Sequence, residues 1–202
     1  MSAVGGDRGE IDRLVLATAN AGKVDELRRL LGSRFHVSAR PTGLAETVED
    51  GASLEVNAVK KAREVAEHTE SLAVADDTGL FVSALGDRPG VHTARFAGPD
   101  ADDDANVAKL LAELDGFADA VDRAARFRTV IAAVWPEGRQ LLVEGLVRGH
   151  ISSRPSGSSG FGYDPVFVPE EGDGRTFAQM SGEEKNRISH RGRAVAALIE
   201  AL

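Results

Sequence analysis

The sequence contains no cysteine, which excludes disulfides, thiolate metal ligands and catalytic thiols. Aromatic residues are also scarce, with 8 Phe, 1 Trp and 1 Tyr among 202 residues, so an aromatic pair inside a polar motif is informative. No apolar run approaches the roughly 18 residues that a membrane-spanning helix needs. Lysine and arginine (24) are fewer than aspartate and glutamate (32), and the net charge of −8 argues against a broad nucleic-acid-binding surface. A small anionic ligand, which needs only a local cluster of cations, is compatible with this composition.

The rest of the composition is that of an ordinary globular protein, with 42% hydrophobic and 28% charged residues. A chain of this length accommodates one large domain or two lobes that share a sheet. Residues 1–13 are rich in glycine and charge and lack the apolar core of a signal peptide. We therefore expect a flexible N-terminal tail ahead of a single domain over residues 14–202, with no membrane partner and a cytoplasmic location.

Short apolar runs alternate with helical patterns in the first half of the chain, and a β-hairpin pattern follows. This alternation predicts strands over 14–18 and 35–37, a third strand that ends at residues 76–77, and helices over 23–31, 54–66 and 106–114. The hairpin is expected over 127–135 and 140–151, followed by a short strand over 165–168 and a final helix over 189–202, with loops at 86–90 and 152–160. The order of elements predicts an α/β protein, with two lobes and a cleft between them.

Two adjacent carboxylates, Asp76 and Asp77, follow a short Leu/Val/Ala run and precede Thr78-Gly79. A buried strand would deliver both charges to its carboxyl end, where open α/β sheets usually place their sites. Like charges side by side repel, so the pair calls for a cation, and hard oxygen ligands suit Mg²⁺. The alternative is a solvated junction between strand and turn, because Asp-Thr-Gly is ordinary turn chemistry.

Residues 18–23 (Thr-Ala-Asn-Ala-Gly-Lys) join the first expected strand to the first expected helix. A phosphate can meet the free N–H groups of a helix N-terminus at such a junction, and Lys23 adds positive charge. The loop is not a Walker A motif, because Ala17 and Val24 stand where that motif has Gly and Ser/Thr. An ordinary turn with a solvent-facing lysine is the alternative reading.

Residues 160–165 (Gly-Phe-Gly-Tyr-Asp-Pro) place two aromatics and an acid among residues that permit unusual backbone angles. An aromatic ring can stack on a purine, while a backbone N–H or a carboxylate reads the edge of the base. In the alternative reading this segment is a turn that is anchored in the core.

A cationic stretch over residues 185–193 stands out in an acidic chain. Such a stretch can clamp a phosphate or read a base edge, although a solvated helix start has the same composition. Glu49 lies in an acidic turn that could add a metal ligand, and Lys60 and Lys61 lie in the helix that follows.

The order and spacing of five segments resemble the inosine triphosphate pyrophosphatase family, over nearly all of residues 14–202. The segments are 18–23, 75–80 (Ala-Asp-Asp-Thr-Gly-Leu), 89–98 (Pro-Gly-Val-His-Thr-Ala-Arg-Phe-Ala-Gly), 160–167, and Glu184-Lys185 with 189–192 (Ser-His-Arg-Gly). The resemblance implies a two-lobed mixed α/β fold about an elongated central sheet, with the nucleotide in the cleft. It further implies a homodimer that needs Mg²⁺ and converts ITP, dITP or XTP to the monophosphate and pyrophosphate, which keeps deaminated purines out of DNA and RNA.

The resemblance also assigns roles to individual residues. Asp77 is implied as the catalytic proton acceptor and a metal ligand, Asp76 as a supporting acid, and Glu49 as a further metal ligand. The residues implied to hold the triphosphate or sugar are Thr18, Ala19, Asn20, Ala21, Gly22, Lys23, Lys61, Thr78 and Lys185. Those implied to form the base pocket are Phe161, Gly162, Tyr163, Asp164, His190 and Arg191. Donors near Arg191 and the backbone are expected to favour a 6-oxo purine over a 6-amino purine.

Three positions depart from the family pattern. Thr78 stands where many members have Ser, which keeps the hydroxyl, and Ser159 replaces a frequent Gly. Val56 stands where many members have an acid, so we expect a weaker metal site from the loss of that carboxylate.

Three other functions are less consistent with these residues than a purine nucleotide pyrophosphatase. A phosphohydrolase that works through an aspartyl-phosphate is disfavoured, because its Asp-x-Asp spacing is absent. A Maf-like pyrophosphatase of other specificity fits segments 161–164 and 190–191 less well. A nucleotide-binding module without catalysis is disfavoured by the intact acidic pair.

Overall fold

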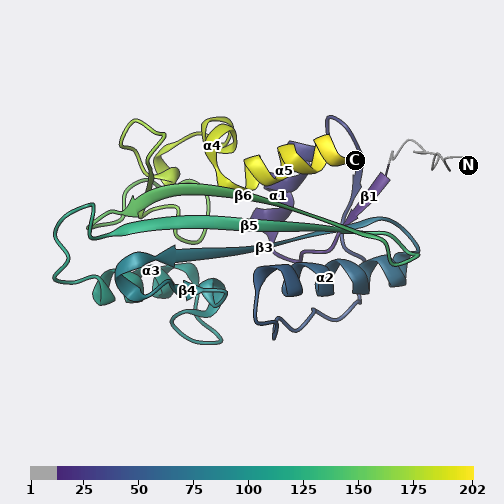
Figure 1. Ribbon diagram of the computed structural model, residues 1–202, viewed down its shortest axis with the longest axis horizontal. Coiled ribbons are helices and arrows are strands. Elements are labelled where there is room, and N and C mark those ends of the chain that lie inside the picture. Colours follow the sequence, from purple (N-terminus) through teal and green to yellow (C-terminus); the bar gives the residue numbers. More distant parts are fainter. Residues whose placement is uncertain (1–12) are drawn as a thin grey trace, which may run out of the picture.

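A mixed seven-stranded sheet forms the centre of the computed structural model, which describes residues 13–202 (Figure 1). The strands are β1 (Arg13–Leu16), β2 (His36–Ser38), β3 (Ala73–Val82), β4 (Arg88–Gly90), β5 (Ala124–Val134), β6 (Gln140–Ile151) and β7 (Phe167–Pro169). The α-helices are α1 (Ala21–Leu31), α2 (Leu54–Thr69), α3 (Asp103–Glu113), α4 (Gly182–Ile188) and α5 (His190–Ala201). The described residues also form short 3₁₀ turns, which are η1 (Ser83–Leu85), η2 (Thr93–Arg95) and η3 (Phe177–Gln179).

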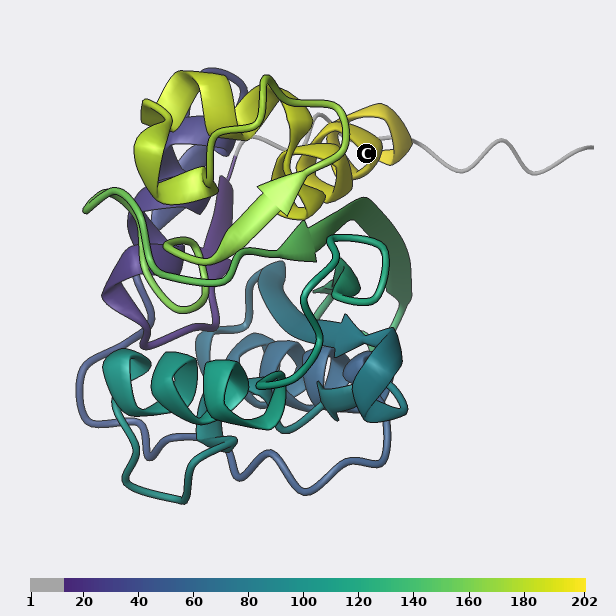
Figure 2. The same cartoon turned by 90° about the vertical axis from the view of Figure 1, so that its left-hand side faces the viewer.

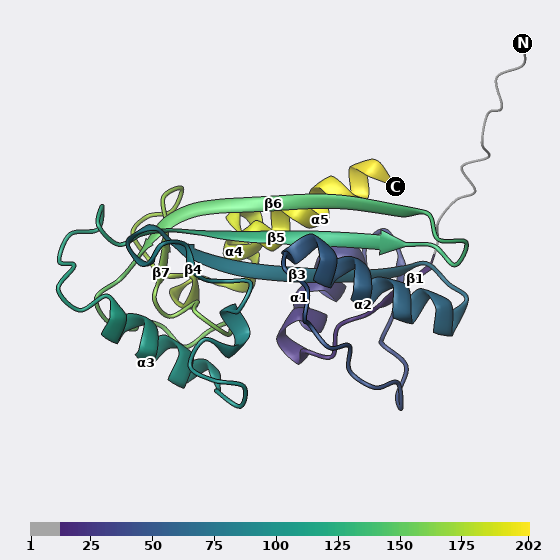
Figure 3. The same cartoon turned by 60° about the horizontal axis from the view of Figure 1, so that its bottom comes forward.

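The sheet has the order β2-β1-β3-β5-β6-β7, and β4 pairs with β3 beside this path. The contacts of β1 with β2 and with β3 are parallel, and the remaining pairings are antiparallel. Strands β3, β5 and β6 run most of the length of the molecule (Figure 3). This arrangement confirms the α/β class and the elongated central sheet.

Helices cover both faces of this sheet. Figure 2 shows α3 on one side and α4 and α5 on the other. Helices α1 and α5 pack against Val74 and Ile131 on one face, whereas α2 packs against Ala73 and Ala75 on the opposite face. This alternation follows from strand geometry, because successive side chains of β3 point to opposite faces.

Helix α2 shows how the sequence produces these contacts. The Ser53 side chain accepts a hydrogen bond from the N–H of Val56, which caps the first turn. Ala58, Ala62 and Ala66 recur at the spacing of one helix face and are fully buried. Because these side chains are small, the helix lies close to the sheet, and a polar residue on the same face can reach the strands.

The edge of β3 explains where a site can form. On the side away from β5, β3 pairs with β1 only up to Val74 and with β4 only from Leu80 onward. Within residues 13–202, the intervening residues 75–79 have no strand partner on that side. The sheet therefore opens in the middle of β3, and side chains from both of its faces can reach one cleft.

Several expected elements are confirmed, and others need correction. The hairpin and the helices near 23–31, 54–66 and 106–114 are present, the last one beginning already at Asp103. The strand expected to end at Asp76-Asp77 continues to Val82, and residues 88–90 of the expected loop form β4. The expected final helix over 189–202 is α5, and a separate helix, α4, precedes it. Residues 1–12 of the expected tail lie outside the described residues, and Arg13 already belongs to β1.

Arg123 ties the end of α3 to the end of β6 and is the basis of a stability prediction. It is 6% exposed, and its guanidinium donates to the carbonyls of Leu114, Phe117, Ile151 and Ser152 at 2.7–3.1 Å. Each carbonyl that loses a buried donor costs about 1–3 kcal/mol. We expect Arg123→Met to lower the free energy of unfolding by about 4 kcal/mol or more, measured by urea denaturation.

The control for this variant is Arg126→Met, which removes a partly exposed arginine paired with Asp87 at 2.8 Å. A surface pair of this kind contributes about 0–1 kcal/mol. Equal stability of the two variants would show that Arg123 does not hold these segments together.

Candidate active site

A cleft of about 560 Å³ opens where the β3 edge is free. This volume is in the range of pockets that bind small molecules. Most of the side chains expected from the sequence line it: Thr18, Ala19, Asn20, Lys23, Glu49, Lys61, Asp77, Thr78, Phe161, Gly162, Tyr163, Asp164, Lys185, His190 and Arg191. Three expected residues, Ala21, Gly22 and Asp76, do not line it.

The turn between β1 and α1 supplies the first wall. Asn20 caps α1, because its side chain accepts a hydrogen bond from the N–H of Lys23 at 3.0 Å, and Thr18 accepts one from the N–H of Asn20 at 3.2 Å. Gly22 is needed for a close approach, since a Cβ there would lie 2.6 Å from the ring of Phe161. The helix N-terminus and the Phe161 ring are therefore neighbours in the cleft.

Asp76 and Asp77 lie on opposite faces of β3 and do not act as a side-by-side pair. Asp76 points toward α1 and α5, where Lys23 and Arg191 surround it. Asp77 points toward α2, where it meets Lys61. The expected repulsion between adjacent carboxylates is thus relieved by cations of the protein itself, one set for each face.

Of the two adjacent aspartates, Asp77 is the one that lines the cleft. Its Oδ1 accepts a hydrogen bond from Lys61 Nζ at 3.1 Å, and its Oδ2 accepts one from Asn57 Nδ2 at 3.1 Å. Burial raises the pKa of Asp77 above its ordinary value, although the positive charges of Lys61 and Lys23 oppose this effect. A carboxylate in this setting is a better proton acceptor than one in water.

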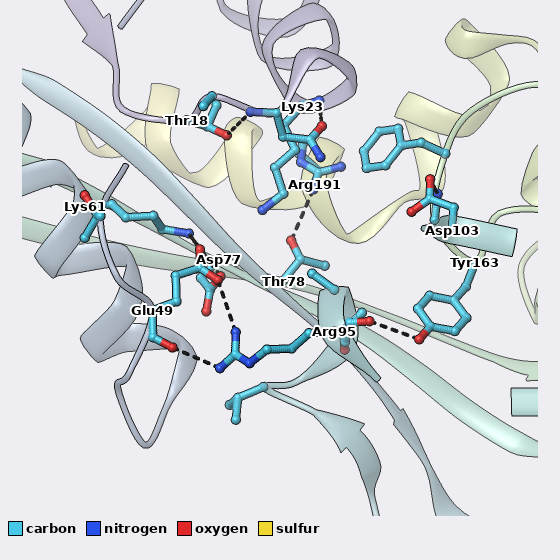
Figure 4. A pocket seen from close by; sticks show the side chains of 18 of the residues that line it. Thr18, Lys23, Glu49, Lys61, Asp77, Thr78, Arg95, Asp103, Tyr163 and Arg191 are labelled. Carbon is cyan, nitrogen blue, oxygen red and sulfur yellow. Dashed lines mark hydrogen bonds and ion pairs between the residues drawn. The ribbon is translucent and has the colours of Figure 1, made fainter. Parts of the chain in front are cut away.

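Lys61 connects Asp77 to Glu49. Its Nζ donates to Glu49 Oε1 at 2.6 Å as well as to Asp77 (Figure 4). It also donates to the backbone carbonyl of Asp76 at 2.8 Å. Burial alone would lower the pKa of Lys61, but the surrounding carboxylates raise it, so the side chain stays charged. The two carboxylates therefore share one cation.

The cleft contains carboxylate oxygens, the hard donors that divalent cations such as Mg²⁺ prefer. Among residues 13–202 no cluster of three potential metal ligands exists. Glu49 and Asp77 nevertheless supply two hard carboxylates within reach of a single point, the ammonium of Lys61. Magnesium is commonly held by one or two carboxylates together with phosphate oxygens and water.

Asp76 is the centre of a buried charge network on the other face. It is 0% exposed, its Oδ2 accepts from Arg191 Nε at 3.1 Å and Nη2 at 2.9 Å, and Lys23 Nζ lies 3.2 Å away. Burial by itself would raise the pKa of Asp76, but the charges of Lys23 and Arg191 outweigh it and hold the pKa far below the ordinary value. Asp76 does not reach a ligand in the cleft, and it orients the two cations.

Glu26 extends this network to the loop over residues 161–164. Its Oε2 accepts from Arg191 Nη1 at 2.5 Å, and its Oε1 accepts from Lys185 Nζ at 2.6 Å. Lys185 also donates to Asp164 Oδ2 at 2.6 Å, and that oxygen accepts from the N–H of Phe161 at 3.0 Å. Lys185 therefore supports the aromatic loop. It also lines the cleft, and its expected contact with the triphosphate or sugar stays a prediction.

The aromatic loop presents one ring to the cleft and buries the other. The Phe161 ring lies 5.0 Å from Lys185 Nζ and 5.5 Å from the guanidinium carbon of Arg191. Tyr163 is 3% exposed, and its hydroxyl donates to the carbonyl of Thr93 at 3.0 Å. His190 stacks on Phe127 with ring centroids 4.5 Å apart, and burial lowers its pKa well below the ordinary value, so this imidazole is neutral.

Residues 91–103 form a wall of the cleft that was not predicted from the sequence. Arg95 and Thr93 line the cleft, as does Asp103, whose carboxylate accepts from the N–H of Gly162 at 2.6 Å. The segment over 89–98 carried the family resemblance, so it was recognisable, but no local pattern assigned it a role. Val56 is 52% exposed and lines a separate shallow groove, so the weaker metal site expected from this residue stays a prediction.

The sequence was also compared with known protein families and with individual proteins. A family model described as the Ham1 family matches residues 14–201. The chain belongs to the Ham1 family. A relative from Desulforamulus reducens, named dITP/XTP pyrophosphatase, is 49% identical over 194 residues, which cover 94% of this chain and 95% of the relative. A relative of the same name from Methylococcus capsulatus is 48% identical over 194 residues, an alignment that covers 94% of this chain and 96% of the relative.

A solved structure supports the same membership at the level of the fold. The HAM1 protein from Coxiella burnetii has a TM-score of 0.82 to this chain at 36% identity, covering 93% of this chain and 96% of that protein. The family that the five sequence segments indicated is therefore confirmed. Over residues 13–202, no helix has both the length and the apolar character required to cross a bilayer.

Proposed function

We propose that this member of the Ham1 family hydrolyses dITP, XTP and ITP to the corresponding monophosphate and pyrophosphate. The names of the relatives support this substrate class. One observation carries the proposal to this chain: the Asp77 carboxylate, the cations Lys23 and Lys61, and the loop with Phe161 line the same cleft. The reaction would keep deaminated purines out of DNA and RNA.

In the proposed reaction, a water molecule attacks the α-phosphorus. A bond forms between the water oxygen and this phosphorus, the bond to the bridging oxygen of the β-phosphate breaks, and pyrophosphate leaves. Asp77 accepts the proton of the water, consistent with the raised pKa of its carboxyl. Lys23 and Lys61 stabilise the negative charge that develops on the phosphates.

We further propose that Glu49 and Asp77 hold Mg²⁺, with the remaining ligands taken from the substrate and water. When bound, the ion would offset phosphate charge. Asn57 and Lys61 hold the Asp77 carboxylate in place through hydrogen bonds at 3.1 Å to its two oxygens.

For the base we propose that Phe161 stacks on the purine and that Arg191 donates to a 6-oxo group. Arg191 has five N–H groups. Four hydrogen bonds are made to protein, from Nε and Nη2 to Asp76, from Nη2 to Thr78 and from Nη1 to Glu26. The second N–H of Nη1 has no acceptor among residues 13–202. A 6-amino group would place a donor against this donor, which costs about 1–3 kcal/mol.

We also propose that residues 14–202 act as one two-lobed domain, as a homodimer, in the cytoplasm. The cleft takes residues from segments spread between Ala17 and Arg191, which supports a single functional unit. Val56 and Leu142 are 52% and 40% exposed and line one shallow groove among charged side chains, and a second copy would cover these two apolar residues. The cytoplasmic location follows from the proposed nucleotide substrates.

The test is a nucleotide panel with MgCl₂ in which pyrophosphate and orthophosphate are measured separately. We expect pyrophosphate from dITP, XTP and ITP, and at least about tenfold lower kcat/KM for dATP and ATP. Orthophosphate as the product would support an aspartyl-phosphate mechanism instead. A preference for pyrimidine substrates would support a Maf-like specificity, and tight binding without turnover would support a non-catalytic module.

A further inference from the structure

The 3₁₀ turn η2 (Thr93–Arg95) contacts both Glu49, the proposed metal ligand, and Tyr163 in the aromatic loop. At one end, Arg95 Nη2 donates to the backbone carbonyl of Glu49 at 2.9 Å, and Nη1 lies 3.9 Å from Glu49 Oε2. At the other end, the carbonyl of Thr93 accepts the hydrogen bond from the Tyr163 hydroxyl. Figure 4 shows this path from Glu49 through Arg95 to Tyr163 along one side of the pocket.

Glu49 depends on such a support, because it lies in an irregular segment between β2 and α2. The other contacts of this segment come mainly from α2, where Lys60 donates to the carbonyl of Val48 and Asn57 accepts from the N–H of Gly51. Arg95 is the contact from the opposite wall, and its two terminal nitrogens face the carbonyl and the carboxylate of the same residue. A guanidinium suits this geometry, because its donors are held in a rigid plane.

The turn itself is fixed to the sheet. Thr93 Oγ1 accepts from the N–H of Leu80 at 2.8 Å and donates to the carbonyl of Gly90 at 2.5 Å, which joins the turn to both β3 and β4. A displacement of Tyr163 is therefore resisted by the same rigid unit that holds Glu49. Two loops distant in sequence share one support.

We infer that Arg95 is a positioning residue for Glu49, and that η2 couples the placement of Glu49 to that of the base loop through Tyr163. This inference rests on the proposed role of Glu49 as a metal ligand. A role in positioning explains why Arg95, a cation in the cleft, is paired with Glu49, the carboxylate that would bind the metal. The base loop and the metal ligand would then be ordered together when the correct nucleotide binds.

The first experiment measures metal binding directly. Mn²⁺ is titrated into the protein with and without a non-hydrolysable dITP analogue and followed by electron paramagnetic resonance, for the wild type and for Arg95→Met, Arg95→Lys and Arg126→Met. Removal of groups that orient a metal ligand commonly reduces affinity by about 10–100-fold. We expect Arg95→Met to weaken Mn²⁺ binding at least about tenfold, Arg95→Lys to recover only part of the loss, and Arg126→Met to match the wild type.

Arg126 is a matched control, because it has the same side-chain exposure (34%) and also pairs with a carboxylate, yet it lies outside the cleft. Circular dichroism and thermal unfolding of each variant establish that the fold is intact. Mn²⁺ affinity of Arg95→Met equal to that of Arg126→Met would overturn the positioning role. This result does not depend on turnover, so it is separate from a failure of the proposed reaction.

The second experiment is a double-mutant cycle between Arg95→Met and Tyr163→Phe, with kcat and KM for dITP measured at several MgCl₂ concentrations. Coupled sites show effects that do not multiply. We expect Tyr163→Phe to raise the MgCl₂ concentration for half-maximal rate, although Tyr163 is not a metal ligand, and the double variant to lose less than the product of the single losses. Independent, multiplicative effects would exclude coupling through η2. A wild type that releases no pyrophosphate would refute the proposed function, while Mn²⁺ binding would still decide the role of Arg95.

Discussion

Replacing Asp77 with Asn will lower kcat for pyrophosphate release from dITP by about 10³-fold or more, since a positioned general base alone contributes about 10²–10⁴-fold. The substitution keeps the size of the side chain and its hydrogen bond with Asn57, but the amide cannot accept the proton of the attacking water. It also removes one of the two carboxylates that share Lys61. Nucleotide binding should be largely preserved, because the base loop and the β1–α1 turn are untouched.

The measurement combines a pyrophosphate-release assay with calorimetric titration of a non-hydrolysable dITP analogue. Asp87→Asn is the matched control, because it changes an exposed carboxylate that pairs with Arg126 outside the cleft. We expect this control to retain wild-type kcat. Near-normal turnover by Asp77→Asn would assign the base to another group.

Replacing Asp76 with Asn will destabilise the protein by about 3–5 kcal/mol, the usual cost of removing one partner from a buried ion pair. Lys23 would then lose the carboxylate that offsets its positive charge, and Arg191 would keep only its ion pair with Glu26. Both cations line the cleft, so kcat/KM should also fall, even though Asp76 itself does not reach the ligand. Urea denaturation and the pyrophosphate assay measure the two effects.

The adjacent carboxylates provide an internal control for this prediction. Asp77→Asn should cost less stability than Asp76→Asn, because Lys61 keeps its contact with Glu49 and because burial already disfavours the charged form of Asp77. If the two variants unfold at the same urea concentration, the division into a structural and a reactive carboxylate is wrong.

Asp76 and Asp77 lie in a part of the fold that local sequence patterns do not predict, whereas other strands could be predicted. The hairpin over 124–134 and 140–151 was predictable, because its apolar strands surround an obvious turn. The continuation of β3 through Asp-Asp-Thr-Gly was not, because this string is typical of a turn. These residues can lie in a buried strand because Lys23 and Arg191 pair with Asp76 Oδ2 and Lys61 pairs with Asp77. Arg191 is 115 positions away from Asp76.

The same reason explains the missed wall of the cleft. Arg95 acts on a residue 46 positions away, and Tyr163 on one 70 positions away. No local periodicity records such contacts. The residues that could be placed from the sequence were those in compact motifs, such as Thr18 to Lys23 and Phe161 to Asp164, because each motif forms one turn with its own internal hydrogen bonds.

The pairing of β3 with β5 runs without interruption from Ala73 opposite Val134 to Val82 opposite Ala125. A slip of this register by one residue would turn every side chain of β3 to the other face. The carboxylate in position 77 would then enter the charge network between α1 and α5, and its neighbour would face α2 and the substrate. The register of the β3–β5 pairing therefore determines which of two chemically identical side chains faces the cleft and becomes the reactive one.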